Sequence, residues 1–471
     1  MLMRKTLLSL FLLFPLISLS AQFVDDGFYR VMNYATKRYI YVMDNTGSVN
    51  MSAMTAEMGA VQLWKGYKKT VSDPASIIYI KKYSDRQYDL ISQGVGVHSM
   101  IGYYVQVYER SDKTYQVYAE GLYLDDDTFN DEEARGYLGT KRKGDARLWN
   151  VFKVDTNDNF FGIKPTVVAN GRKFKPFFAD FAFSFADSGM RAWVVDSIAC
   201  GAVIVSELKS EIIADNTPVI IECTNDSASQ NKLSLYKSTG EHPVANLLSG
   251  VYFNNPSRLN VSKDCCTEYN PATMRVLGIM SDGKLGYVKS DQKYLAANES
   301  YLIVPEGSAD EMPVLTVGEY KLYKEQLDKA QQEIYESLNI EYNNVMASLN
   351  DLDLFIKNEC SDVASQFTDA IDTISMKLRE FPSMLDKSYA NYTLVRDSSD
   401  FKDELDFFSY FISVIHDKAK EAEEEFIRSS VKSALIDKDD VIFDLIGHRL
   451  DKITRPGVYL INGKKVFISN P

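Results

Sequence analysis

Few residues of this chain combine the types and the spacing that catalysis requires. The four histidines lie in four separate segments, without a carboxylate or a cysteine at a catalytic spacing: His98, His242, His416 and His448. The common motifs of zinc proteases, serine hydrolases and phosphate-binding loops do not occur. We therefore predict a non-enzymatic protein with no catalytic residue and no cofactor. A divergent hydrolase stays open, because paired glycosidase carboxylates are distant in sequence and meet only in the fold.

The sequence does not predict a metal site either. Cys265 and Cys266 are adjacent, but no histidine lies in the neighbouring sequence, so we interpret them as structural. The acidic stretch 125–133 lacks the ordered alternation and the closing glutamate of an EF-hand loop, which favours a solvated loop over a calcium site. The five cysteines are too scattered for a disulfide scaffold, and Cys200 with Cys223 is the best pair for a single disulfide.

The charge of the chain argues against a nucleic-acid partner. The 471 residues carry a formal net charge of −13, whereas binding to nucleic acid draws on clustered lysines and arginines that displace counterions from phosphates. Acidity of this size mainly favours solubility.

The first residues are typical of a signal peptide. Arg4 and Lys5 precede an apolar run from Leu7 to Leu19, which is too short to span a bilayer, and small residues follow up to Ala21. We predict that residues 1–21 are removed and that the protein is exported; the alternative is a non-cleaved anchor. No later apolar run approaches about 18 residues, so no transmembrane segment is expected after signal removal.

Residues 22–155 have the pattern of an all-β domain, with short alternating tyrosine-rich runs separated by turn residues. Trp64 and Trp149, which each close such a unit, lie 85 positions apart. This distance is two steps of a repeat a little over 40 residues long, so it predicts three copies around one core. In the middle copy, a tyrosine or valine between Tyr104 and Tyr118 is expected to take the place of the tryptophan.

The end of the first unit, Gln62-Leu63-Trp64, resembles the Gln-x-Trp repeat of the ricin-type β-trefoil, while Arg147-Leu148-Trp149 keeps only the tryptophan. The resemblance implies that both tryptophans belong to the core. It also implies shallow sugar pockets, in which an aspartate accepts hydrogen bonds and an aromatic ring packs on the sugar. Matching positions give Asp89, and Asp125 with Phe129 or Tyr137, as ligand-binding residues; Tyr41 replaces the aspartate of the first copy. A plain surface role for Asp89 and Asp125 is the alternative.

Residues 156–316 again read as strands bounded by Gly, Asn, Asp and Pro. They resemble a β-sandwich-like module of exported proteins from Bacteroidetes-type bacteria, for which the resemblance implies no chemistry.

Residues 317–437 change to a helical pattern, with apolar residues every three or four positions from Leu338 onward. Pro382 and the polar stretch 397–400 are expected to interrupt it, which predicts an antiparallel hairpin or a three-helix bundle. A membrane-surface helix is not favoured, because the polar face is mixed and acidic rather than basic.

Residues 438–471 return to short strands, with a hairpin through Asn462-Gly463, a pair that suits a type I′ turn. This tail resembles the C-terminal sorting signal of proteins exported by the type IX system. The matching residues are Asp444, Leu445, Gly447, Arg449, Gly457, Tyr459, Asn462, Gly463, Lys464, Lys465 and Val466. His448 stands where the family has Arg. The resemblance implies a secretion-machinery partner; the alternative is a hairpin that only packs on a neighbouring domain.

Together these patterns predict a multidomain α+β protein: a β-trefoil, a β-sandwich-like module, an α-helical bundle and a short C-terminal β unit. The predicted function is binding of a glycan or another extracellular ligand by the trefoil of a secreted or cell-surface protein. The alternative is a structural or adhesin-type protein whose helices or β modules bind a protein partner.

Overall fold

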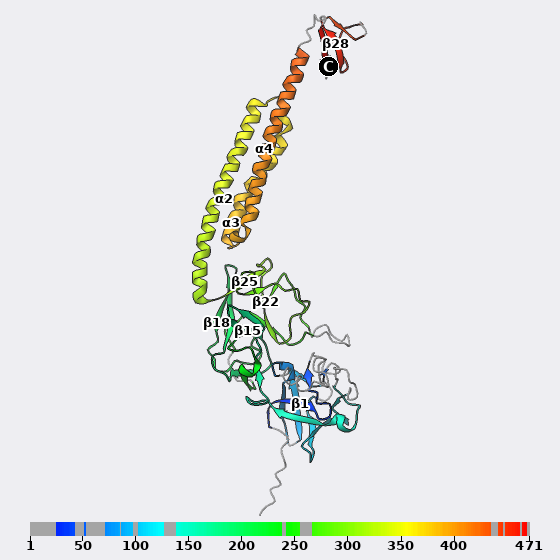
Figure 1. Ribbon diagram of the computed structural model, residues 1–471, viewed down its shortest axis with the longest axis vertical. Coiled ribbons are helices and arrows are strands. Elements are labelled where there is room, and N and C mark those ends of the chain that lie inside the picture. Colours follow the sequence, from blue (N-terminus) through cyan, green and yellow to red (C-terminus); the bar gives the residue numbers. More distant parts are fainter. Residues whose placement is uncertain are drawn as a thin grey trace, which may run out of the picture. The chain divides into compact units, whose positions relative to one another are not determined.

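The computed structural model (Figure 1) describes most of the chain. The described residues are 25–42, 51–52, 71–84, 86–97, 102–126, 138–237, 242–254, 266–434, 441–445, 448–461 and 464–468. The predicted signal peptide, Trp64, Phe129 and Tyr137 lie outside them. The prediction of a mixed α+β chain is confirmed. The chain divides into two compact units, residues 1–320 and 321–471, and each is described by itself.

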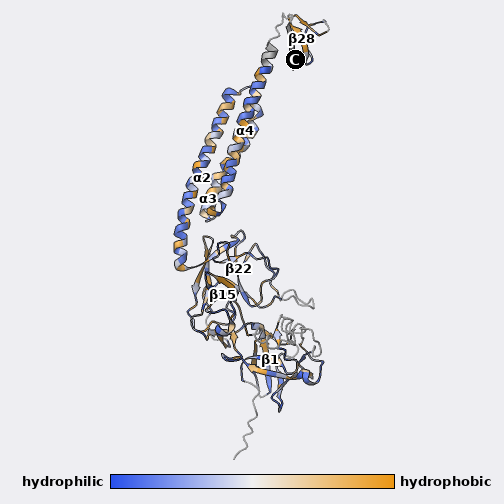
Figure 2. Ribbon diagram, in the orientation of Figure 1, coloured by the Kyte–Doolittle hydropathy of each residue, from blue (hydrophilic) through white to orange (hydrophobic). Residues whose placement is uncertain are grey.

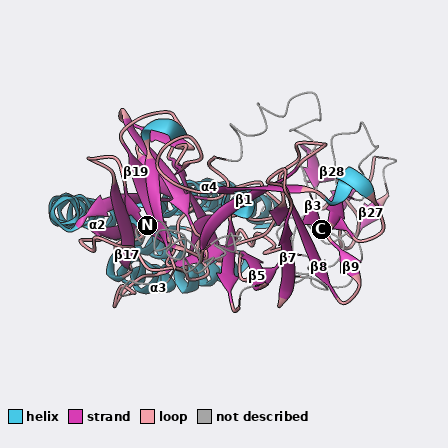
Figure 3. Cartoon of the chain, turned by 90° about the horizontal axis from the view of Figure 1, so that it is seen from below, coloured by secondary structure: helices cyan, strands magenta, loops and turns pink. Residues whose placement is uncertain are grey.

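The first part of the β-rich unit is a closed circuit of strands. The order is β1 (Gly27–Asn33), β4 (Ile78–Lys82), β5 (Gln87–Ser92), β7 (Val105–Glu109), β8 (Tyr115–Ala119) and β12 (Trp149–Lys153). Each strand runs antiparallel to the next, and β12 pairs with both β8 and β1, which closes the circuit. Figure 3 shows β5, β7 and β8 side by side, followed by the short β9 (Leu122–Tyr123), which pairs with β8.

Three copies of one structural unit build this circuit. In each copy, a tyrosine of the opening strand faces the first residue of the closing strand: Tyr29 with Ile78, Tyr88 with Val105, and Tyr115 with Trp149. Each copy also repeats one backbone hydrogen bond: Ile40 N–H to Val31 O at 2.8 Å, Val97 N–H to Leu90 O at 2.8 Å, and Leu124 N–H to Val117 O at 3.0 Å. The side chains of all these residues contribute to one hydrophobic core. The same strand pairing and the same hydrogen bond thus recur three times around this core.

The copies are bounded differently from the sequence prediction. A 3₁₀ turn, η3 (Pro74–Ser76), precedes Ile78 just as η4 (Gly144–Arg147) precedes Trp149, so Ile78 is the counterpart of Trp149 in the first copy. Residues 78–82, which the sequence assigned to the middle copy, therefore close the first one. Val105 closes the middle copy and lies within the interval expected to replace its tryptophan.

The remainder of the unit is a ten-stranded sheet and a three-stranded sheet. The ten-stranded order is β14 (Val167–Ala169), β15 (Arg172–Phe177), β19 (Val219–Cys223), β17 (Arg191–Ala199), β18 (Ala202–Glu207), β25 (Glu311–Thr316), β23 (Leu285–Val288), β22 (Met274–Ile279), β24 (Glu299–Ile303) and β21 (Leu248–Val251). The smaller sheet is β13 (Phe161–Gly162), β20 (Lys232–Tyr236) and β16 (Ala182–Phe185). Apart from the parallel pair β18–β25, the neighbours are antiparallel.

The strand circuit and the sheets share a core. Phe28 and Tyr79 from β1 and β4 pack in one cluster with Phe161 and Phe181. The fully buried Arg30 of β1 donates to Asn159 Oδ1 at 2.7 Å and to the carbonyl of Phe160 at 3.0 Å. Because a buried charge is tolerated only with such partners, Arg30 fixes the circuit to the segment that follows it.

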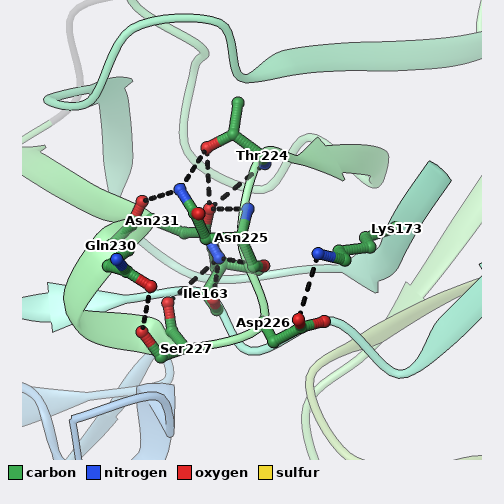
Figure 4. A network of polar contacts seen from close by, with 8 residues as sticks. All are labelled: Ile163, Lys173, Thr224, Asn225, Asp226, Ser227, Gln230 and Asn231. Carbon is green, nitrogen blue, oxygen red and sulfur yellow. Dashed lines mark hydrogen bonds and ion pairs between the residues drawn. The ribbon is translucent and has the colours of Figure 1, made fainter. Parts of the chain in front are cut away.

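Asn231, which is fully buried, organises the loop between β19 and β20 (Figure 4). Its Nδ2 donates to the carbonyls of Ile163, Asn225 and Ser227 at 3.0, 2.8 and 3.1 Å. Its Oδ1 accepts the backbone N–H groups of Thr224 and Asn225 at 3.2 and 3.1 Å. One side chain therefore satisfies five backbone groups, and its bond to the carbonyl of Ile163 is fully buried.

The expected disulfide between Cys200 and Cys223 is wrong. The two residues are not bonded to each other. Cys223 lies next to Glu222, which faces Arg191 at the start of β17, whereas Cys200 follows Ala199 at the far end of the same strand. Close to ten strand residues separate the two positions, or roughly 30 Å, far beyond the Cα separation of about 7 Å that a disulfide tolerates.

Asp73 is the titrating group from which we expect a pH-dependent stability. Its Oδ1 caps η3 by accepting the N–H of Ala75 at 3.0 Å, and burial raises its pKa from 3.8 to about 6. The folded state therefore binds more protons than the unfolded state between about pH 4 and 6, so this group's contribution to stability is lost as pH rises through that window.

We therefore expect Asp73→Asn, which keeps a capping oxygen, to match the parent protein in unfolding free energy near pH 4. At pH 8 it should be more stable by about 1–3 kcal/mol. Urea unfolding at both pH values measures the difference. A difference that stays constant with pH would contradict the assignment.

The second unit contains a bundle of three helices, α2 (Val317–Glu359), α3 (Thr368–Ala390) and α4 (Leu394–Ala434), of which the first residues of α2 belong to the first unit. Polar and apolar residues intermix along all three helices (Figure 2). Residues spaced by three or four positions form one core, including Leu349, Leu378, Phe381, Leu385 and Leu405.

Both predicted helix interruptions are wrong. Pro382 lies inside α3, and residues 397–400 lie inside α4. A proline in a helix interior costs about 3 kcal/mol, but Leu378, Phe381 and Leu385 around it are almost fully buried and hold the helix. The chain turns instead at 360–367 and at 391–393, where Tyr392 has a φ of 59°.

The C-terminal strands form a four-stranded sheet with the order β27 (Arg449–Leu450), β26 (Ile442–Phe443), β28 (Gly457–Ile461) and β29 (Lys464–Ile468). Ile461 faces Lys464, which leaves two residues for the connection and confirms the predicted hairpin. Its core is small and centres on Ile442, Tyr459 and Ile461.

Candidate functional site: an aspartate beside exposed tyrosines

Asp89 lies on β5 in the middle copy of the strand circuit, opposite Lys81 on β4. Its side chain is only 4% exposed, and Oδ1 accepts the backbone N–H of Tyr104 at 2.8 Å. Tyr104 has a φ of 51°, a conformation that is strained for a bulky residue. The carboxylate of Asp89 therefore helps to hold Tyr104 in the conformation that presents its ring.

Two tyrosine rings form a platform next to Asp89. The centres of Tyr83 and Tyr104 are 4.9 Å apart with an interplanar angle of 35°, and the residues are 43% and 62% exposed. Tyr103, the neighbour of Tyr104, is 45% exposed. Exposed aromatic side chains at one place offer apolar faces with polar hydroxyl tips, a combination that suits recognition of amphipathic ligands.

Lys81 supplies a cation at the same place. Its Nζ lies 4.4 Å from the centre of the Tyr83 ring and donates to Tyr83 Oη at 3.1 Å. This hydrogen bond raises the pKa of Lys81. The hydrogen bond from Lys81 lowers the pKa of Tyr83. The hydrogen bond with Asp89 and the loss of solvent have the opposite effect and are larger together, so the pKa of Tyr83 is raised. Both shifts keep Lys81 as an ammonium group and Tyr83 as a neutral phenol at neutral pH.

Asp125 has a different environment from the one the resemblance implied. It lies on β10 (Asp125–Asp126), which pairs with β11 (Leu138–Gly139), and it is fully buried. Its Oδ2 accepts the backbone N–H of Arg142. The structure thus gives Asp125 a role in holding this pair of strands, and it is not on the surface. Phe129 and Tyr137, its expected stacking partners, lie outside the described residues.

Trp149 has the core position that was expected. It is fully buried, and its Nε1 donates to the carbonyl of Leu124 at 3.0 Å. Trp64 lies outside the described residues.

The sequence predicted Asp89 as a ligand-binding residue but did not point to Lys81, Tyr83 or Tyr104. Lys81 lies on β4, Tyr83 directly follows that strand, and Tyr104 directly precedes β7. These residues reach Asp89 only because β4 and β7 flank β5. No local pattern carries that information. The missing signal was the order of the strands.

The described histidines do not form a common site. His242 contacts Thr217 Oγ1 at 3.1 Å, the ring of His416 packs 4.3 Å from that of Phe355, and His448 contacts Asp444 at 3.1 Å. Within the described ranges, no three His, Cys, Asp or Glu side chains come together as a metal site would require. No helix in those ranges is long and apolar enough to cross a membrane.

Comparison with family models and with curated proteins assigns no family to the chain. No family model and no curated protein matches the chain. Among solved structures, a mosquitocidal holotoxin is 9% identical with a TM-score of 0.22, over 59% of this chain and 40% of that one. Cry35Ab1 is 14% identical with a TM-score of 0.20, over 38% of this chain and 48% of that one. Each match therefore covers less than half of the solved protein's length. TM-scores this low assign neither a fold nor a function.

Proposed function

We propose that the protein is an exported, non-enzymatic bacterial protein whose N-terminal strand circuit is a ricin-like β-trefoil that binds a glycan. The closed circuit of six strands, built from three equivalent units around one core, supports the trefoil. In this proposal the sugar contacts the platform of Tyr83 and Tyr104 and the polar groups of Asp89 and Lys81.

The arrangement of these four side chains is the observation that carries the proposal. A pyranose has an apolar face of C–H groups and a rim of hydroxyls, so it needs a flat apolar partner and nearby hydrogen-bonding groups. The platform supplies the first, and Lys81, Asp89 and the tyrosine hydroxyls supply the second. The two rings of the platform are exposed, which suits recognition rather than a reaction that must exclude water.

Removing either ring of the platform should weaken glycan binding. We expect Tyr83→Ala and Tyr104→Ala each to raise the dissociation constant at least tenfold, which corresponds to about 1.4 kcal/mol, because each removes half of the apolar surface. Calorimetric titration with a sugar selected on a glycan array measures the change.

Tyr34→Ala is the matched control, because Tyr34 is 41% exposed on the same strand circuit and a cation, Lys37, also lies over its ring. Equal losses of affinity in the control and in the two platform variants would contradict the assignment of the site.

Export and sorting by the tail belong to the same proposal. The motif residues of the tail also have structural roles: Asp444 caps the turn to His448 at 2.8 Å, and the Tyr459 hydroxyl donates to the carbonyl of Arg455 at 2.6 Å. We expect deletion of residues 441–471 to retain the protein inside the cell, as measured by immunoblotting of cell fractions and medium. Unchanged export with the deletion would show that the tail only packs.

A second candidate function, binding of a protein partner by the bundle, is favoured by an exposed aromatic cluster on α4. Phe407, Tyr410 and Phe411 are 58%, 68% and 39% exposed, and the rings of Phe407 and Phe411 stack at 5.8 Å. Exposed apolar patches of this kind mark interaction sites. A glycan array that stays silent on every sugar would favour this candidate over the first.

A further inference from the structure

A cavity of about 150 Å³ is lined by strands of the ten-stranded sheet. Its inner wall consists of side chains from six strands: Phe174, Trp193, Val205, Ile220, Leu285 and Val314. The polar part of its lining, here called the mouth, comes from the turn between β14 and β15, from Lys284 and from the start of α2. The cavity is thus formed by regular strands, which hold a site more rigidly than loops do.

A network of hydrogen bonds fixes the largest wall residue. Trp193 Nε1 donates to Glu222 Oε2 at 3.1 Å, and Arg172 donates to the same carboxylate at 2.8 and 2.9 Å. Burial raises the pKa of Glu222, but the bonds from Arg172 and Trp193 outweigh it and lower the pKa below its usual value. The Arg172 guanidinium also lies 5.1 Å from the ring centre of Phe174. The aromatic walls are therefore held in place before any ligand enters.

The charges at the mouth already have partners. Lys284 pairs with Asp282 at 2.9 Å, and the carboxylate of Glu319 accepts the backbone N–H of Thr316 at 2.8 Å in a capping box at the start of α2. The inner wall is apolar apart from the indole N–H, which Glu222 accepts. A charged ligand would lose its hydration in this cavity without a matching counter-charge, at a large cost. An uncharged ligand would not lose hydration at this cost.

We propose that this cavity binds an uncharged apolar group of phenyl size. Apolar protein cavities of about 150 Å³ bind benzene or xenon, so the volume accepts one six-membered ring or a branched aliphatic group of similar size. The ligand class is thus a small neutral aromatic molecule, or the neutral aromatic end of a larger one that extends through the mouth. The site is separate from the tyrosine platform and does not depend on it.

Titration of the whole protein with benzyl alcohol tests this inference, with benzoate and benzylamine as charged analogues of similar size. Saturation-transfer NMR detects the bound ring and gives the dissociation constant. Leu285→Phe and Val314→Met each add side-chain volume to a half-buried wall position. Ile303→Phe adds volume at a position that is 52% exposed and does not line the cavity. Circular dichroism confirms that each variant keeps the fold.

We expect saturable binding of benzyl alcohol, at least tenfold tighter than that of either charged analogue. Leu285→Phe and Val314→Met should each weaken it at least tenfold, and Ile303→Phe should leave it unchanged. The absence of saturable binding would overturn the inference, as would equal binding to all variants. Tighter binding of benzoate or benzylamine would overturn the uncharged ligand class.

Discussion

Replacing Trp149 by alanine is expected to lower the free energy of unfolding of the β-rich unit by about 3–5 kcal/mol. Trp149 is fully buried in the core shared by the three copies, and it closes the third of them. The substitution leaves a cavity in this core, because the paired strands around it cannot move together to close it. It also leaves the carbonyl of Leu124 without its indole donor.

Urea unfolding followed by tryptophan fluorescence measures this loss, because Trp64 and Trp193 remain in the variant and the helical bundle contains no tryptophan. Phe152→Ala is the control, since Phe152 lies on the same strand, β12, and is 38% exposed. We expect it to cost less than about 1 kcal/mol. A cost for Trp149→Ala as small as that of the control would contradict the shared core.

Replacing Asn231 by leucine, which has nearly the same shape, is expected to cost at least about 3 kcal/mol. The leucine would fill the space but leave the N–H groups of Thr224 and Asn225 and the carbonyls of Ile163 and Ser227 without their partner. Each buried polar group that loses its hydrogen bond costs about 1–3 kcal/mol, and part of this is recovered if water enters.

The same urea unfolding experiment compares Asn231→Leu with Asn225→Leu. The side chain of Asn225 is half-buried in the same loop and donates to Thr224 Oγ1 at 3.0 Å. Because its neighbours reach water, we expect a cost of about 1 kcal/mol. If both substitutions cost the same, the buried network of Asn231 does not determine the stability of this loop.

The helical bundle shows what the spacing of apolar residues can predict. The positions of its core, such as Leu349 and Leu378, follow from the spacing of apolar residues, and the structure confirms them. The helix ends do not follow, because the proline rule was applied without the packing that offsets it. Pro382 stays inside α3, while the chain turns at Tyr392, whose positive φ has no signal in the sequence.

The strand circuit shows the same limit at the candidate site. Three copies could be predicted from repeated units, but their boundaries could not, because Ile78 has the closing position of the first copy that the spacing assigned to Trp64. Asp89 could be predicted from its place in the repeat. The platform could not, because Tyr83 and Tyr104 approach each other only through the pairing of β4 and β7 with β5.

A glycan array probed with the purified protein, in parallel with Tyr83→Ala and Tyr104→Ala, tests the proposed function most directly. We predict that the parent protein binds at least one class of sugar and that both variants lose that signal while their circular dichroism spectra stay unchanged. Silence of the parent protein on every sugar, or the same pattern of binding in all three proteins, would contradict glycan recognition at this site.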